Sequence, residues 1–168
     1  MVKKTLGKII LFLLAMGICL SAAYIGSLYS TPSIPAWYDH LQKPDFTPPS
    51  WVFGPVWLVL YCLMGLSLYM IFQAGIKKKE VFLGLTFFIA QLVFNIAWSY
   101  VFFGLHSTFF GLMTIIGLWF LILCTIVQVS RFSVAAGAVL IPYFLWVSFA
   151  TILNYFIMSM NEMSYVLF

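Results

Sequence analysis

Residues 80–103 read EVFLGLTFFIAQLVFNIAWSYVFF, and a single charged residue, Glu80, stands at the start of this stretch. A helix rises about 1.5 Å per residue, so a helix of this length would cross the roughly 30 Å hydrocarbon core of a bilayer. The rest of the stretch carries no charge, as a helix surrounded by lipid requires. The stretch therefore predicts a transmembrane helix.

Four further apolar runs have similar length. They lie near 7–29, 51–74, 107–129 and 132–158. The whole chain of 168 residues is 64% hydrophobic and 7% charged, whereas soluble domains are about 45–50% apolar and about 25% charged. We therefore expect an all-α fold: one domain over 1–168, a bundle of five transmembrane helices surrounded by a lipid bilayer.

The amino terminus allows an alternative interpretation. The sequence MVKKTLGK, followed by an apolar run ending in Ser21-Ala22-Ala23, resembles a cleavable signal peptide. The apolar run continues to about Tyr29, which makes it longer than the usual apolar region of such a peptide and long enough to span a bilayer. We expect 7–29 to be the first span, with cleavage as the alternative.

Prolines mark the longest connection, residues 30–50. This segment, STPSIPAWYDHLQKPDFTPPS, holds five of the seven prolines, which predicts a stiff and ordered loop. The other two, Pro55 and Pro142, fall inside predicted spans, where each is expected to remove one helical hydrogen bond and bend its helix.

Basic residues gather on one side of the predicted membrane. With the amino terminus in the cytoplasm, the internal segments hold Lys3, Lys4, Lys8, Lys77, Lys78, Lys79 and Arg131, and the external segments hold only Lys43. Positive residues favour the cytoplasmic side, so we expect a multi-pass protein of the cell membrane with its amino terminus inside and its carboxyl terminus outside. This topology explains the net charge of +4 without nucleic acid as a partner.

Residues typical of enzymes are scarce within the spans. The four carboxylates, on Asp39, Asp45, Glu80 and Glu162, all lie at or beyond the predicted membrane edges. The three cysteines lie in apolar runs without CxxC spacing, and the two histidines, His40 and His106, lie far apart in loops. We expect no proton relay, no metal site and no cofactor.

Uncharged polar residues inside the spans are more informative. Gln91, Asn95 and Ser99 recur every fourth residue, which places them on one face of their helix beside Trp98. An amide in hydrocarbon needs a hydrogen-bond partner. This face either holds helices together or lines a ligand cavity.

Large aromatic side chains mark two other spans. Trp57 and Tyr61 are one turn apart in the second span, and Trp146 in the fifth lies at helical spacing from Tyr143 and Ala150. Trp57 and Trp146 are deeper than the interfacial belt where tryptophan usually lies in membrane proteins. Bulky rings beside a small residue leave space for a ligand.

Four blocks of sequence carry a resemblance to a known family. They are Trp37-Tyr38-x-x-Leu41-x-Lys43-Pro44-x-Phe46-x-Pro48-Pro49, Trp57-x-x-Leu60-Tyr61-x-x-x-Gly65, Gln91-x-x-x-Asn95-x-x-Trp98-Ser99 and Pro142-Tyr143-x-x-Trp146-x-x-Phe149-Ala150-x-x-Leu153-Asn154. In this order they resemble the translocator protein family, also called tryptophan-rich sensory proteins or peripheral-type benzodiazepine receptors, in a prokaryotic member.

The resemblance implies a five-helix bundle, usually a homodimer, with a cavity beneath the first loop. Family ligands are protoporphyrin IX and other tetrapyrroles, isoquinoline carboxamides and benzodiazepines. The candidate ligand-binding residues are Tyr38, Pro48, Phe53, Trp57, Tyr61, Asn95, Trp98, Tyr143, Trp146, Ala150 and Leu153.

Three functions follow as hypotheses. The leading one is a porphyrin receptor that acts in sensing, sequestration or transport. The second is a porphyrin-degrading enzyme that requires light and oxygen, for which Trp57 and Trp146 are the candidate catalytic residues by resemblance. The third is a structural or regulatory membrane subunit whose polar residues only pack helices.

Overall fold

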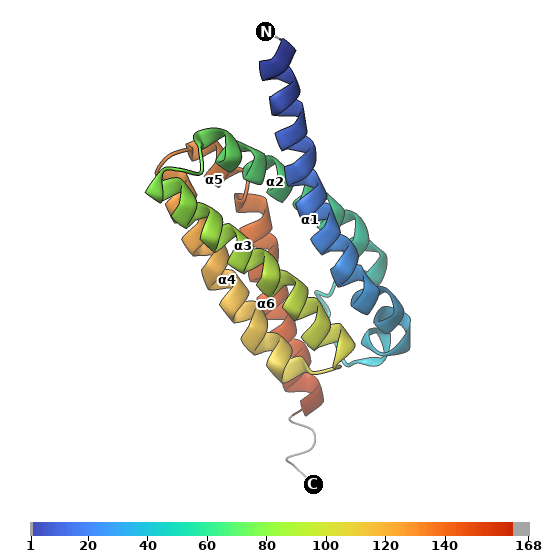
Figure 1. The fold of residues 1–168 in the computed structure, drawn as a ribbon. Helices are drawn as coiled ribbons and strands as arrows, with labels where there is room; N and C mark the ends of the chain where they lie inside the picture. The colour runs from blue at the N-terminus through green and yellow to red at the C-terminus, as the bar shows by residue number, and fades with distance from the viewer. Residues whose placement is uncertain (1, 163–168) are drawn as a thin grey trace.

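The computed structural model describes residues 2–162, which fold into helices and short turns without a strand (Figure 1). The helices are α1 (Val2–Ala36), α2 (Phe53–Ala74), α3 (Lys79–Ser99), α4 (Thr108–Ser130), α5 (Val134–Ala138) and α6 (Ile141–Glu162). Two 3-10 turns, η1 (Tyr38–His40) and η2 (Ser50–Val52), lie between α1 and α2, and a π-helical turn, η3 (Tyr100–Gly104), extends α3.

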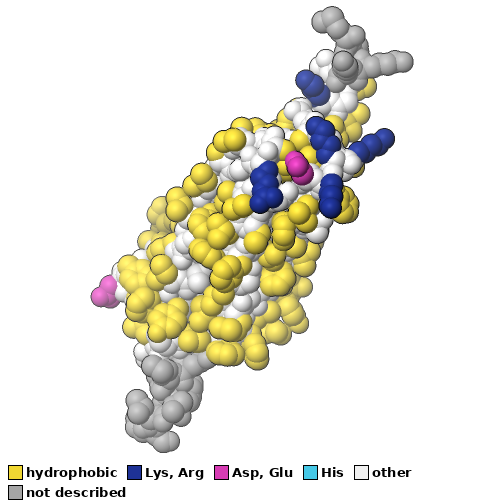
Figure 2. Space-filling model, turned by 90° about the vertical axis from the view of Figure 1, so that its left-hand side faces the viewer, with side chains coloured by type: hydrophobic (Ala, Val, Ile, Leu, Met, Phe, Trp, Pro, Cys, Tyr) yellow, Lys and Arg dark blue, Asp and Glu magenta, His cyan; other side chains and the backbone are white. Residues whose placement is uncertain are grey.

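Within residues 2–162, five helical segments are long and apolar enough to cross a membrane. They are Thr5–Ala36, Ser50–Ala74, Lys79–Gly104, Thr108–Ser130 and Val134–Asn161. Apolar side chains cover most of the face of the bundle that Figure 2 shows, and exposed large apolar residues occur on all five segments. The predicted all-α bundle of five spans is confirmed.

Two close helix pairs build the bundle, α1 with α2 and α3 with α4, and α6 packs along α4. The first pair approaches closely at Gly65, where an added Cβ would lie 3.3 Å from the Cα of Met16. Fully buried side chains such as Leu68, Ile115 and Val147 fill the interior. The amino-terminal part of α1 extends past the end of the bundle (Figure 1).

The first helix is longer than the sequence predicts. It continues through Pro32 and Pro35 to Ala36, so the first seven residues of the expected 30–50 loop are helical. A tertiary contact holds this last part, because the Ser33 hydroxyl donates a hydrogen bond to the carbonyl of Phe103 at 2.7 Å. Contacts of this kind let membrane helices tolerate proline.

The bend predicted at Pro55 is wrong, whereas the fifth span is interrupted directly before Pro142, as predicted. Pro55 is the third residue of α2, where the N–H has no helical partner, so proline removes no hydrogen bond there. The fifth span, Val134–Asn161, is interrupted between α5 and α6, and Pro142 is the second residue of α6. Proline lacks the N–H that would donate to the carbonyl of Ala138, and the N–H of Leu140 donates instead to the carbonyl of Gly137 at 3.1 Å.

Candidate functional site

The helices enclose a cavity of about 400 Å³ between α1, α2, α3, η3 and α6, below η1. This volume is within the range of roughly 300–1,000 Å³ that is typical of small-molecule sites. Eight of the eleven candidate residues line it: Tyr38, Phe53, Trp57, Tyr61, Asn95, Trp98, Ala150 and Leu153. The structure thus brings together predicted residues from three of the five spans and the first loop.

Aromatic rings form one continuous wall of the cavity. The Trp57 ring lies 6.1 Å from the Trp98 ring and 5.8 Å from the Tyr61 ring, with interplanar angles of 32° and 38°. Trp98 in turn stacks on Phe102 at 5.6 Å. These rings give a flat ligand broad surfaces on which to stack.

Asn95 sits at the centre of a buried hydrogen-bond network. Its Oδ1 accepts from the Tyr61 hydroxyl, and its Nδ2 donates to the Tyr143 hydroxyl at 2.8 Å. One amide therefore joins α2, α3 and α6 while it also lines the cavity. The two interpretations of this polar face, helix packing and cavity lining, both apply to Asn95.

A second amide fixes the tryptophan of the same helix. Trp98 Nε1 donates to Asn154 Oδ1 at 3.3 Å, and Asn154 Nδ2 donates to the carbonyl of Thr108 at 2.9 Å. This chain runs from α3 through α6 to the start of α4. The Trp98 ring is thereby held in one orientation against the cavity.

Tyr38 contributes a buried polar group that no described residue satisfies. The residue is 3% exposed, lines the cavity from η1, and its hydroxyl has no hydrogen-bond partner among the described residues. Burial raises the pKa of this hydroxyl, and the neighbouring Asp39 carboxylate raises it further. The group therefore stays protonated at neutral pH and is available to a ligand as a donor.

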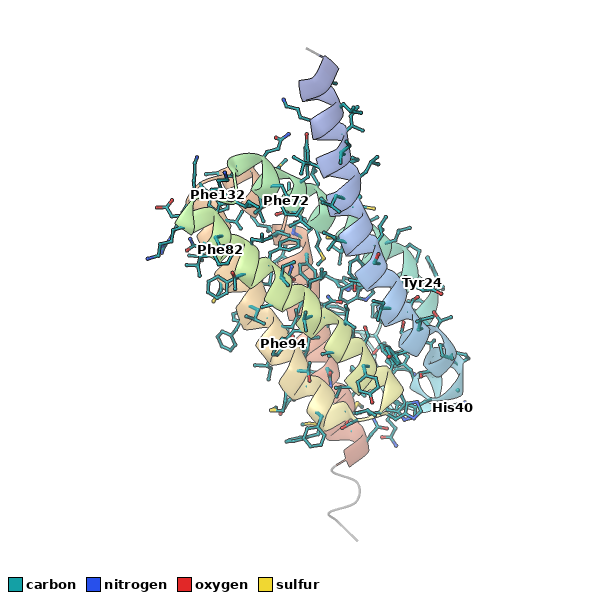
Figure 3. The ribbon with its side chains drawn as sticks, in the orientation of Figure 1. Tyr24, His40, Phe72, Phe82, Phe94 and Phe132 are labelled. Carbon is teal, nitrogen blue, oxygen red and sulfur yellow. The ribbon has the colours of Figure 1, made fainter. Side chains whose placement is uncertain are left out.

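The loop above the cavity is fastened to the end of α6. The Gln42 N–H donates to Asn161 Oδ1 at 3.0 Å, and Asn161 Nδ2 donates to the Gln42 carbonyl at 2.9 Å. Phe46 packs edge-on against Phe156 at 5.5 Å. His40 lies in this loop, at the end of the molecule away from the start of α1 (Figure 3).

Three candidate residues do not line the cavity. Pro48 is half-buried in the loop, and Tyr143 is completely buried behind Asn95. Trp146 packs against Phe53, whose ring is 6.1 Å away, and its buried Nε1 has no partner among the described residues. Helical spacing alone could not separate a residue that lines the space from one that packs behind its wall.

The largest set missed by the sequence analysis is the wall formed by α1. It consists of Leu20, Ala23, Tyr24, Gly26, Ser27, Ser30, Thr31 and Ile34. Small and hydroxyl residues recur here at helical spacing, and that pattern was the available signal. It is hidden within a run that otherwise indicates only a membrane span.

The cavity is open along the seam between α1 and α2. Two of its lining residues, Tyr24 of α1 and Leu58 of α2, are 66% and 56% exposed. The Tyr24 label marks the outer side of α1 in Figure 3. Both residues lie inside membrane-spanning segments, so this opening faces lipid.

Five membrane-crossing helices, with an aromatic cavity between four of them, define a helical membrane protein with a site of ligand size. The family model that matches residues 15–160 is that of the TspO/MBR family. The chain belongs to this family, and the resemblance drawn from the four sequence blocks is confirmed.

Relatives named in three ways agree with this assignment. The "Tryptophan-rich protein TspO" of Chlorobaculum tepidum is 41% identical over 92% of this chain and 98% of its own length. The "Translocator protein" of Homo sapiens is 34% identical over 88% and 90%, and "Protein CrtK" of Rhodobacter capsulatus is 33% identical over 85% and 88%. The chain is thus a multi-pass membrane protein, and its family supports a sensing or binding role.

Proposed function

We propose that this protein is a membrane receptor for porphyrins, protoporphyrin IX and related tetrapyrroles, in their sensing, sequestration or transport. The observation that carries the proposal is the wall of Trp57, Trp98 and Phe102 facing a cavity of about 400 Å³. A flat macrocycle needs such ring surfaces together with a few polar groups. The unpartnered Tyr38 hydroxyl is one such group.

The same cavity would accept smaller flat aromatic ligands. Isoquinoline carboxamides and benzodiazepines combine aromatic rings with a carbonyl acceptor, and Tyr38 offers a protonated donor. The opening between Tyr24 and Leu58 gives an apolar ligand a route from the bilayer. These ligands and a porphyrin should therefore exclude one another.

In the proposed arrangement the amino terminus lies in the cytoplasm and the η1 loop lies outside. Lys77, Lys78, Lys79 and Arg131 are at the end of the bundle opposite this loop, as the positive-inside rule requires. The carboxyl terminus, residues 163–168, lies outside the described residues, although α6 ends at Glu162 beside the loop. The homodimer implied by the resemblance stays a prediction.

A titration in the dark tests the proposed function. We expect protoporphyrin IX to quench the tryptophan fluorescence of the purified protein saturably, with one site per chain, and an isoquinoline carboxamide to reverse the quenching. Absence of saturable quenching would leave the structural-subunit hypothesis in its place.

Illumination of the same sample separates a receptor from an enzyme. We expect the porphyrin absorbance to fall no faster than in a protein-free control. A loss that depends on the protein would instead support the degradation reaction. Trp57 would then be the candidate in contact with the porphyrin, since Trp146 packs behind Phe53.

A further inference from the structure

A second hollow lies at the opposite end of the molecule from the η1 loop, and no proposed function uses it. Its volume is about 520 Å³, and it lies between α1 and the turn that joins α2 to α3. Its lining includes Leu11, Leu14, Phe72, Ile76, Lys77 and Lys78. We call this hollow the basal notch.

The basal notch exists because α1 extends beyond the end of the other helices. Leu11 is level with the turn, so the part of α1 from Val2 to Leu11 extends roughly 13 Å farther, at about 1.5 Å per residue (Figure 1). Large apolar side chains in this part are at least half exposed: Leu6 at 55%, Ile9 at 50% and Ile10 at 56%. Among the described residues, no other helix covers this side of α1.

Backbone geometry places two lysines at the rim of the basal notch. Gly75 ends α2 with a φ of +92°, a backbone conformation that residues other than glycine rarely adopt. The chain then turns, and Lys78 immediately precedes the first residue of α3. Lys77 and Lys78 thus line the same hollow as the apolar Phe72 and Ile76.

The charge around the basal notch is strongly positive. Lys8 lies one turn before Leu11 on α1, Lys79 begins α3, and Arg131 directly follows α4. Figure 2 shows Lys and Arg side chains gathered at one end of the molecule. Among the described residues, Glu80 is the one carboxylate there, since Asp39, Asp45 and Glu162 belong to the opposite end. An excess of cations beside an apolar floor selects a ligand with both an anionic and an apolar part.

We propose that the basal notch binds one anionic phospholipid. One acyl chain lies on Leu11, Leu14, Phe72 and Ile76, and the phosphate contacts the ammonium groups of Lys77 and Lys78. A zwitterionic phospholipid fits the floor but has no net charge to match the rim, and a soluble anion matches the rim but not the floor. The phospholipid supplies both parts, and basic pockets between membrane helices are suited to such head groups.

Native mass spectrometry of the purified full-length protein in neutral detergent tests the proposal. With added phosphatidylglycerol, we expect one lipid to bind in preference to all others, and phosphatidylcholine to bind at least tenfold more weakly. The double variant Lys77→Gln/Lys78→Gln should weaken phosphatidylglycerol binding by more than tenfold, because it removes both ammonium groups that would contact the phosphate directly. These exposed substitutions leave the buried core intact.

The matched control is Lys79→Gln/Arg131→Gln, which removes the same charge from the same end without touching the lining. We expect phosphatidylglycerol binding by this variant to stay within twofold of the unchanged protein. Equal losses in the two double variants would show diffuse surface attraction and overturn the proposal. Equal binding of phosphatidylcholine, or competition by millimolar inorganic phosphate, would overturn it as well.

Discussion

The free energy of unfolding of the Asn95→Leu variant is expected to be about 2 kcal/mol lower than that of the unchanged protein. The substitution removes both hydrogen bonds of the amide and leaves the buried hydroxyls of Tyr61 and Tyr143 without their partner. Interhelical hydrogen bonds in membrane proteins are worth roughly 0.6 kcal/mol on average and at most about 1.7 kcal/mol. The loss of two such bonds, with two buried hydroxyls left without a partner, adds up to about 2 kcal/mol. Equilibrium unfolding in mixed micelles measures this loss.

Gln91→Leu is the matched control for this prediction, one turn away on the same helix. Gln91 is 1% exposed, and neither its Oε1 nor its Nε2 has a hydrogen-bond partner among the described residues. Leucine removes a buried polar group of this kind, so we expect unchanged or increased stability, by up to about 1 kcal/mol. A loss as large as that of Asn95→Leu would contradict this account of the two amides.

Ala23→Phe is expected to weaken protoporphyrin IX binding at least tenfold while the protein remains folded. Ala23 lines the cavity from α1, and a phenyl ring at this position would occupy space that the ligand needs. Such a loss corresponds to about 1.4 kcal/mol of binding free energy or more. The dissociation constant from fluorescence quenching, together with the melting temperature, checks the prediction.

Gly17→Phe provides the control on the same helix. Gly17 is exposed, and an added Cβ there would meet nothing within 4 Å. The ring should therefore project into lipid and leave the dissociation constant unchanged. If both variants weakened protoporphyrin IX binding equally, the effect would come from any ring added to α1. The cavity would then not be the binding site.

These two substitutions test different hypotheses. Asn95 both packs helices and lines the cavity, so a variant at this position cannot separate a receptor from a structural subunit. Ala23 lines the cavity without a polar contact of its own, so its effect reports on the space alone. The receptor hypothesis therefore depends on Ala23 more than on Asn95.

Hydrophobic run length was sufficient to predict the five spans, because lipid imposes one requirement on every crossing helix. The helix ends were less predictable. Pro32 and Pro35 suggested a loop, and a contact from Ser33 to Phe103, 70 residues along the chain, keeps them helical. Pro142, in contrast, predicted a bend, and the fifth span is interrupted directly before it, between α5 and α6.

The candidate site was predictable where side-chain type carried the signal. Trp57, Asn95 and Trp98 are unusual within a membrane span, and all three line the cavity. Ala23 and Ser27 are ordinary residues for a membrane helix, so the helical spacing of small and hydroxyl residues was the one signal for the α1 wall. Trp146 is as unusual as Trp57, but it packs against Phe53 and does not line the cavity. The spacing of residues along a helix does not show which of two packed rings faces the cavity.

Photo-cross-linking in a bilayer tests the central claim most directly. An isoquinoline carboxamide with a photoreactive group would be activated on the reconstituted protein, and the modified residues would be mapped by mass spectrometry. We predict labelling within 20–34 of α1 and 53–61 of α2, which protoporphyrin IX abolishes. Labelling confined to outward residues of α3 and α4, such as Phe82, Phe94 and Phe110, and insensitive to the porphyrin, would contradict the account.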